Sequence, residues 1–222
     1  MTIGMLGGTG LEGSGLALRF GQAGFPVLIG SRSVERARGR AQELADKLGK
    51  RGYTAVFTGC ENAEIAAAAD LVFLTAPFEH AADLLKACVP TFRAGTTLVD
   101  VTVPLRFQAG GVELRELVEG SASEYLARYL PEGMALVAAF KTIPAQLLAD
   151  LDASLDCDVF VCSDSQEAKL RVVEIASRIP SLRPLDAGSL REARTLERMS
   201  ALAIGINRRY KVKSARFRVV GV

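Results

Sequence analysis

The chain has 222 residues, 49% of them apolar and 23% charged, with a net charge of +2 at pH 7, which is the composition of an ordinary globular protein long enough for one substantial domain. So small a net charge gives no support for binding to nucleic acid or to a membrane surface. No run approaches the roughly 18 apolar residues of a membrane-spanning helix, and the single histidine gives no basis for a histidine-rich metal site, so we expect neither a membrane nor a metal.

The first half of the chain alternates predicted strands and helices. Short runs rich in Val, Ile and Leu predict strands, and longer amphipathic patterns predict helices. The predicted strands are 2–6, 26–30, 53–59, 71–77 and 96–104. The predicted helices between them are 11–23, 34–49, 61–70 and 78–89. This alternation predicts an α/β protein with a doubly wound parallel sheet covered on both faces.

The second half is expected to hold an irregular loop on the active-site side, over residues 105–120, with a turn at QAGG (108–111). The elements predicted after it are a helix at 121–130 capped by Ser121 or Ser123, strands at 134–140, 158–163 and 182–188, helices at 165–178 and 190–210, and a terminal strand in the tail 211–222. We expect two domains, residues 1–145 and a smaller C-terminal domain, residues 146–222, that closes the active-site cleft.

The stretch GGTGLEGSG follows the first predicted strand and opens the first helix. In it Gly8, Gly10 and Gly13 satisfy the pattern G-x-G-x-x-G. One glycine allows the tight turn, one lets the backbone approach a pyrophosphate at the helix N-terminus, and one lets the helix pack closely on the strand. At the first strand–helix junction this pattern predicts a Rossmann-type dinucleotide site, with a purely structural turn as the alternative. The candidate binding residues in the loop are Gly8, Thr9, Gly10 and Leu11.

The end of the second strand favours NADP(H) over NAD(H). An NAD site usually has an Asp or Glu there, which holds the ribose 2′-hydroxyl. Here the sequence is Gly30, Ser31, Arg32, and a hydroxyl and a guanidinium are suited to a 2′-phosphate. Arg36, one turn along the next helix, adds a further positive charge. The alternative is an exposed helix start with scattered arginines.

Two titratable residues lie near this predicted site. Glu12 follows the glycine loop, and because a carboxylate repels phosphate we expect its side chain to face solvent. His80 follows the strand that ends at Pro77, at the sheet edge where ligands bind, so it is a candidate cofactor-binding residue. The alternative for His80 is an ordinary helix-surface residue.

Separated motifs along most of the chain resemble one family. They are MLGGTGLEGSGLALRF followed by VLIGSRS, PFEHAADLL, KTIPA and LRPLDAGSL. Together they resemble the NADPH-dependent oxidoreductases of coenzyme F420, the 8-hydroxy-5-deazaflavin coenzyme. The resemblance implies hydride transfer between NADPH and F420, an N-terminal domain that holds NADP, a smaller C-terminal domain over the second cofactor, and a homodimer.

The resemblance also implies which residues form the site. The positions that match NADP contacts are Thr9, Gly10, Ser31 and Arg32, with Ala76 and Pro77 along the nicotinamide half. The segment near the deazaflavin is Lys141, Thr142, Ile143 and Pro144. The chain departs from the archaeal pattern at Lys141, where that pattern has histidine.

Lys141 is the predicted catalytic residue. It follows an apolar strand at the carboxyl edge of the sheet, where a cation would stabilise negative charge that grows on an accepting ring. The alternative is a solvated lysine at a strand end. Asp100 and Thr102, after the preceding strand, could orient a cofactor or merely satisfy loop amides.

Three further questions stay open at this point. The C-terminal end of the chain carries six cations: Arg208, Arg209, Lys211, Lys213, Arg216 and Arg218. This basic segment is either a surface for the anionic tail of the deazaflavin or for an acidic face of a partner, or a solvated edge strand protected by charge. Other functions that fit are an NADPH-dependent reductase of another small acceptor (flavin, ferric chelate, keto or imino compound) and a non-enzymatic NADP sensor. Four cysteines without a CxxC pair, and no signal-peptide pattern, predict a cytoplasmic protein with reduced thiols.

Overall fold

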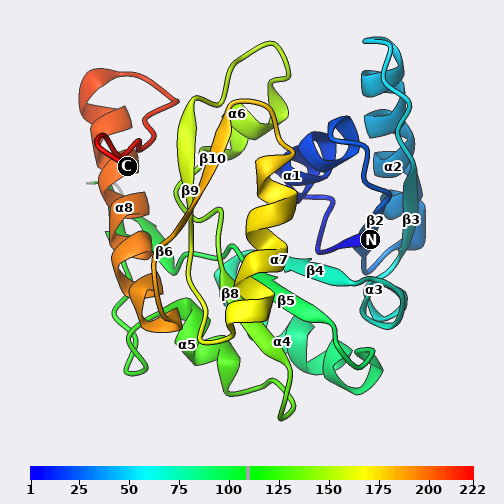
Figure 1. Ribbon diagram of the computed structural model, residues 1–222, viewed down its shortest axis with the longest axis horizontal. Coiled ribbons are helices and arrows are strands. Elements are labelled where there is room, and N and C mark those ends of the chain that lie inside the picture. Colours follow the sequence, from blue (N-terminus) through cyan, green and yellow to red (C-terminus); the bar gives the residue numbers. More distant parts are fainter. Residues whose placement is uncertain (109–110) are drawn as a thin grey trace.

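A computed structural model of the chain describes residues 1–108 and 111–222. Its centre is a six-stranded parallel sheet with the strand order β3-β2-β1-β4-β5-β8 (Figure 1). The strands are β1 Ile3–Leu6, β2 Val27–Ser31, β3 Phe57–Glu61, β4 Leu71–Leu74, β5 Thr97–Asp100 and β8 Ala135–Ala138. The predicted doubly wound parallel sheet is therefore confirmed, and the strand order is that of a Rossmann fold.

Helices cover both faces of this sheet, because its central strands β1, β4 and β5 are buried on both sides. The helices that connect its strands are α1 Leu11–Gln22, α2 Val34–Gly49, α3 Asn62–Ala68, α4 Phe78–Cys88 (followed by the 3₁₀ turn η1 Val89–Thr91) and α5 Ala122–Ala127. One buried cluster packs α1 and α2 against one face, and a second cluster packs α3, α4 and α5 against the other. Ser33 and Ser121 cap α2 and α5 through their hydroxyl groups.

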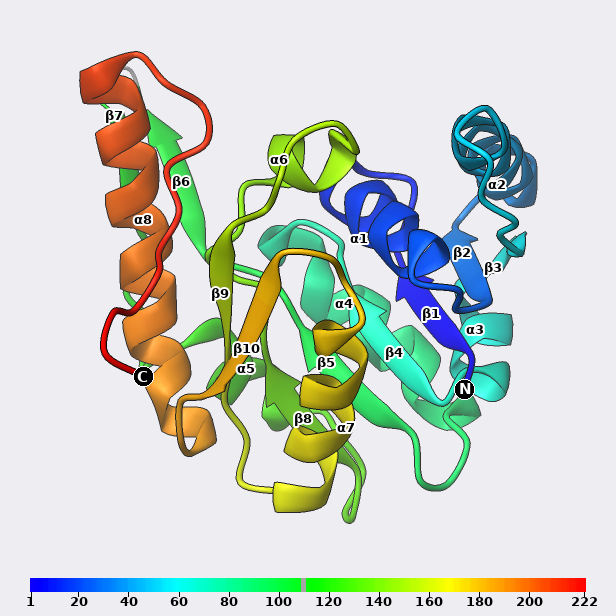
Figure 2. The same ribbon diagram turned by 45° about the horizontal axis from the view of Figure 1, so that its top comes forward.

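Most of the remaining elements lie near β8, and one short helix, α6 Ala145–Ala149, lies beside α1 (Figure 2). The other elements after β8 are β9 Cys157–Val161, α7 Gln166–Ser177, β10 Leu182–Asp186, η2 Leu190–Glu192 and α8 Ala193–Tyr210. Strands β9 and β10 form a separate parallel pair, which is joined to the main sheet by an antiparallel bridge between Ala138 and Cys162. The first buried cluster runs across residue 145, from Ile3 to Leu182. The division into domains 1–145 and 146–222 stays a prediction.

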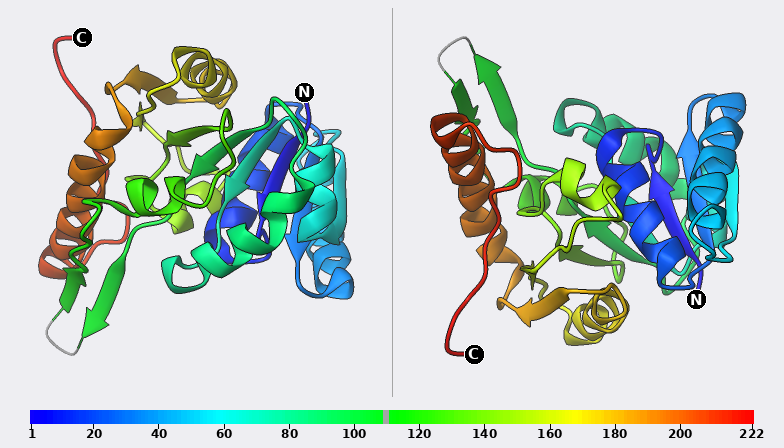
Figure 3. Two further views of the ribbon diagram at one scale, coloured as in Figure 1. Left: turned by 90° about the horizontal axis from the view of Figure 1, so that it is seen from below. Right: turned by 90° about the horizontal axis from the view of Figure 1, so that it is seen from above.

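The structure corrects the predictions for three segments. Residues 105–120 contain an antiparallel hairpin, β6 Leu105–Gln108 and β7 Gly111–Leu114, beside α8 (Figure 3). The predicted turn at 108–111 includes residues 109 and 110, which lie outside the described residues. The short helix α6 was not predicted. The tail 211–222 is not a strand. The amide of Asp158 on β9 donates to the carbonyl of Phe217 (2.9 Å), and two side chains bind Val219: Asp158 accepts from its amide and Arg183 donates to its carbonyl.

Over the described residues, no helix combines the length and the apolarity that crossing a bilayer requires.

Candidate active site

The candidate site lies at the carboxyl ends of β1 and β4, where the strand order reverses direction. From this point β1 leads into α1 on one face of the sheet and β4 leads into α4 on the other. A crevice at such a switch point is where open α/β sheets bind ligands. Two cavities meet there, and four residues line both of them: Gly10, Thr75, Ala76 and Pro77.

The three glycines of the motif differ in the space around them. A Cβ on Gly8 would lie 2.6 Å from the Cβ of Met5, so this position has no room for a side chain. A Cβ on Gly13 would lie 2.6 Å from Oγ1 of Thr75, which shows how closely α1 approaches the strand layer. A Cβ on Gly10 would meet only the carbonyl oxygen of Gly7, at 3.9 Å. The free protein has room for a side chain at Gly10, so the glycine there fits the close approach of a ligand.

The first cavity, of about 690 Å³, runs from the glycine loop to the end of β2. The predicted residues that line it are Thr9, Gly10, Ser31, Arg32, Arg36, Ala76, Pro77 and His80. Ser31 is buried, and its Oγ accepts a hydrogen bond from the amide of Ser33 (3.2 Å). Arg32 and Arg36 are exposed at the cavity wall. The cavity is thus neutral along the glycine loop, and near Ser31 its lining includes two arginines and the carboxylate of Glu61.

The sequence reasoning missed Asn62 in this cavity. Its Oδ1 accepts a hydrogen bond from the amide of Gly7 (3.0 Å) and so fixes the turn after β1. Gly7 has a φ of +71°, which glycine adopts readily. The signal available in the sequence was the position of Asn62 directly after β3, at the same edge of the sheet.

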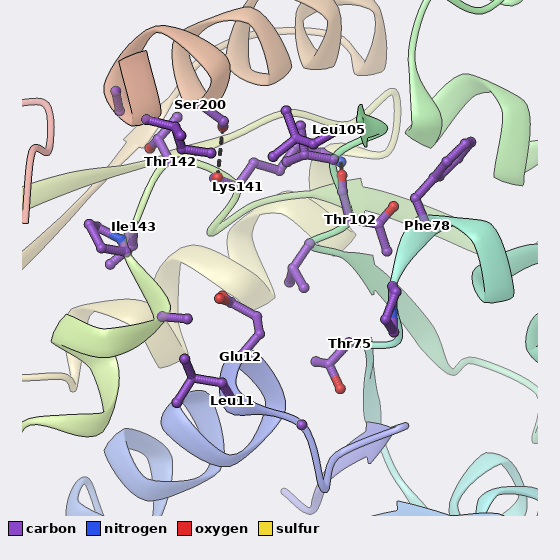
Figure 4. A pocket seen from close by; sticks show the side chains of 18 of the residues that line it. Leu11, Glu12, Thr75, Phe78, Thr102, Leu105, Lys141, Thr142, Ile143 and Ser200 are labelled. Carbon is purple, nitrogen blue, oxygen red and sulfur yellow. Dashed lines mark hydrogen bonds between the residues drawn. The ribbon is translucent and has the colours of Figure 1, made fainter. Parts of the chain in front are cut away.

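The second cavity, of about 420 Å³, lies between the N-terminus of α1, the segment 141–145 and α8 (Figure 4). Its volume is within the range of small-molecule sites. The predicted residues Leu11, Lys141, Thr142, Ile143 and Pro144 line this cavity and not the first. Helix α8 contributes Ser200 and Asn207, which the sequence reasoning did not select. The cavity therefore joins residues from both ends of the chain.

Lys141 lies in this wall, with its side chain fully buried, so the alternative of a solvated lysine is wrong. Its Nζ donates to Oδ2 of Asp100 (2.7 Å) and to the carbonyl of Thr102, and it pairs with Oε1 of Glu197 on α8 (3.2 Å). Burial opposes the charged form, but Asp100 and Glu197 outweigh it and raise the pKa of Lys141. Burial raises the pKa of Glu197, in spite of the nearby ammonium.

Asp100 is the centre of this network. Its Oδ1 accepts from the amide of Thr102 (2.9 Å), and its Oδ2 accepts from Ser123 Oγ (2.6 Å) as well as from Lys141. Both oxygens of Glu197 accept from the amide of Ala122. Asp100 therefore satisfies a loop amide, one of the two roles considered for it, and binds the Lys141 ammonium as well.

Glu12 does not face solvent, contrary to the expectation from the sequence. Figure 4 shows its carboxyl group rising from α1 into the second cavity, below Lys141 and Ile143. Its Oε1 is buried and has no hydrogen-bond partner among the described residues, and burial raises the pKa of the carboxyl group to about 8. Oγ1 of Thr102, in the same cavity, is also buried without such a partner. Two orphaned polar atoms in one cavity fit a ligand that carries polar groups.

Known proteins resemble the chain over its whole length. The family model for "NADP oxidoreductase coenzyme F420-dependent" matches residues 2–104. The F420-dependent NADP reductase of Methanocaldococcus jannaschii is 35% identical over 224 residues, with 100% of this chain and 99% of the relative covered. That of Methanothermobacter thermautotrophicus is 37% identical over 225 residues, with 100% and 96% covered. The crystal structure of an Arthrobacter sp. FB24 protein assigned as an F420-dependent NADP reductase matches with a TM-score of 0.81 and 26% identity, over 99% of both chains.

The parallel sheet, the glycine loop and the paired cavities define a Rossmann-type dinucleotide-binding oxidoreductase. The chain is 35% and 37% identical to the two archaeal reductases over its whole length. It therefore belongs to the family of F420-dependent NADP oxidoreductases. The family resemblance predicted from the sequence motifs is confirmed.

Proposed function

We propose that the protein transfers a hydride between NADPH and coenzyme F420. The observation that supports this most is that the dinucleotide cavity and the second cavity adjoin, with Gly10, Thr75, Ala76 and Pro77 lining both. A dinucleotide that runs from Arg32 past Gly10 would bring its nicotinamide to the place where the two cavities adjoin. The two coenzymes themselves supply the hydride chemistry. The protein orients their rings against each other and excludes water from between them.

The binding roles that we propose follow from charge and position. Ser31, Arg32 and Arg36 hold the 2′-phosphate of NADP(H), and the N-terminal amides of α1 hold the pyrophosphate. Ala76, Pro77 and His80 border the dinucleotide on the β4 side. Thr142, Ile143 and Pro144 form the acceptor side and exclude water from it.

We propose that Lys141 acts on the acceptor side as a positioning residue. The three protons of its ammonium group are directed at Asp100, the Thr102 carbonyl and Glu197, so no N–H is left for a ring in the cavity. Through these contacts it fixes the loop after β5 that carries Thr102. Its positive charge is offset by the adjacent carboxyl groups of Asp100 and Glu197.

Measuring NADPH oxidation with different acceptors tests the proposed function. We expect turnover with F420 and at least tenfold slower turnover with free flavins, ferric chelates or small keto and imino compounds. Turnover with one of those acceptors alone would favour a reductase of another type. Tight NADPH binding without turnover on any acceptor would favour a non-enzymatic NADP sensor.

Gly10→Ala should raise the dissociation constant of NADPH about tenfold or more while leaving the fold intact. The added methyl group meets nothing in the free protein but occupies the space through which the pyrophosphate approaches. The free energy of unfolding should change by less than about 1 kcal/mol. The matched control is Gly13→Ala, which should lower stability by about 1–3 kcal/mol because its methyl group would meet Thr75 and Gly8. Unchanged NADPH affinity in Gly10→Ala would contradict the assignment of the loop.

We propose further that the protein is a cytoplasmic homodimer. The hairpin β6–β7 and α8 expose large apolar side chains, with Phe107 74% and Tyr210 71% exposed, which suits a surface that a second copy covers. The four cysteines are free thiols, as is usual in a reducing compartment. Sedimentation should give twice the 23.6 kDa mass of the chain, and a monomeric mass at micromolar concentration would contradict the dimer.

A further inference from the structure

Glu12 places a carboxyl group where a bound pyrophosphate would repel a carboxylate. It is the second residue of α1, beside the path of the pyrophosphate, and its side chain points into the second cavity. Among the described residues that line this cavity, Lys141 is the only other ionisable group, and its ammonium is held by Asp100 and Glu197. The ionisable groups of the adjoining cavity are Arg32, Arg36, Glu61, His80 and Asp83.

These surroundings favour the neutral form of Glu12. No described group donates a hydrogen bond to Oε1, and the nearby residues Ile143 and Pro144 are apolar. Burial of Oε1 without a donor disfavours the carboxylate, so the group tends to keep its proton. This agrees with the burial-raised pKa of about 8 for the Glu12 carboxyl group. The free cleft therefore holds a proton on Glu12 at neutral pH.

The part of the dinucleotide that reaches Glu12 is the part that changes charge. With the 2′-phosphate at Arg32 and the pyrophosphate at Gly10, only the nicotinamide half extends into the cavity that Glu12 lines. The nicotinamide ring is neutral in NADPH and positively charged in NADP⁺. A cation within a few ångströms of a buried carboxyl group favours its ionised form.

We propose that Glu12 holds a proton at its carboxyl group in the free and NADPH-bound cleft, and releases it when the oxidised nicotinamide of NADP⁺ lies beside it. The proposal rests on the proposed function. It also gives a source for the proton that F420 reduction consumes. A C–H bond breaks on the dihydronicotinamide, and its electron pair forms a C–H bond on the deazaflavin. The O–H bond of Glu12 breaks as an N–H bond forms on the reduced ring, and the carboxylate regains a proton from water when NADP⁺ leaves.

The test is the pH dependence of dinucleotide binding without F420. The ratio of the NADP⁺ association constant to that of NADPH should rise at least tenfold between about pH 6 and pH 8, and level off above it, because only NADP⁺ favours the deprotonated acid. Both ligands share the 2′-phosphate, so the pH dependence of that group cancels in the ratio. NADP⁺ binding at pH 7 should also release up to one proton, which an indicator dye measures.

Glu12→Gln keeps the shape of the side chain but cannot lose a proton, so its ratio should not change with pH. The matched control is Glu35→Gln, in the same turn of α2, where the acid is exposed and bound to Ser33; it should behave as the wild type. A flat ratio in the wild type, or a slope that persists in Glu12→Gln, would overturn the proposal. Proton release by the wild type tests it even if Glu12→Gln does not fold. Failure of both dinucleotides to bind would instead reject the proposed function.

Discussion

Arg32→Ala lowers the affinity for NADPH by roughly ten- to a hundredfold and leaves the affinity for NADH unchanged. A hydrogen bond to a charged group contributes about 1.5–3 kcal/mol, and about 1.4 kcal/mol corresponds to a factor of ten. Only NADPH has the 2′-phosphate that this guanidinium would bind. Arg32 is exposed at the wall of the dinucleotide cavity, so its removal leaves the core intact. Titration of each dinucleotide, followed by fluorescence or calorimetry, gives both dissociation constants.

A surface arginine on α2, the helix that follows Arg32 in the chain, provides the control for this experiment. Arg40 pairs with Glu43 (2.7 Å) and lies outside the lining of the dinucleotide cavity, so Arg40→Ala should bind NADPH as the wild type does. In Arg36→Ala, which removes the second cation of the cavity, we expect a smaller loss with the same preference for NADPH. Equal losses for NADPH and NADH in Arg32→Ala would refute the assignment of Arg32 to the 2′-phosphate.

Lys141→Met lowers the free energy of unfolding by about 3–5 kcal/mol, because it leaves two buried carboxyl groups without their cation. The side chains of Asp100 and Glu197 are 0% and 1% exposed, so water cannot replace the ammonium. Denaturant unfolding measures the effect. Lys50→Met, at the exposed end of α2, is the control and should change stability by less than about 0.5 kcal/mol.

The loss of unfolding free energy in Lys141→Met should be larger at high pH than at low pH. Burial raises the pKa of Glu197 even with the lysine present, and removal of the lysine raises it further. Because protonation makes the Glu197 carboxyl group neutral, the variant should recover part of its stability at about pH 5 and lose most at about pH 8. A loss that is small at every pH would show that the network contributes little. NADPH affinity should stay close to that of the wild type in any folded sample.

The donor side of the site could be predicted because its signals are local. Gly8, Gly10 and Gly13 stand at fixed spacing after a strand, and Ser31 and Arg32 stand at the end of the next. Parallel strands bring these segments to one edge of the sheet whatever the rest of the chain does. Lys141 was placed at that edge for the same reason.

The remaining features depend on contacts between distant segments. Glu12 faces the cavity because the segment 141–145 and α8 lie opposite it, and no local pattern specifies which segments those are. The partners of Lys141 come from β5 and α8, far apart in the sequence. The hairpin β6–β7 is largely exposed, so it has no buried face to give the alternating apolar pattern of a strand.

The buried Arg19 on α1 has a consequence for how the acceptor side can vary. Its guanidinium donates to the carbonyl groups of Leu147, Leu148, Asp150 and Ala153, and so ties α6 and the chain after it to the helix whose N-terminus borders the glycine loop. Helix α1 thereby fixes the distance between the glycine loop at its N-terminus and the segment that follows Pro144. If the proposed binding roles hold, substitutions at Thr142 or Ile143 change the shape of the second cavity without moving the dinucleotide, whereas loss of Arg19 changes the distance between α1 and the segment after Pro144.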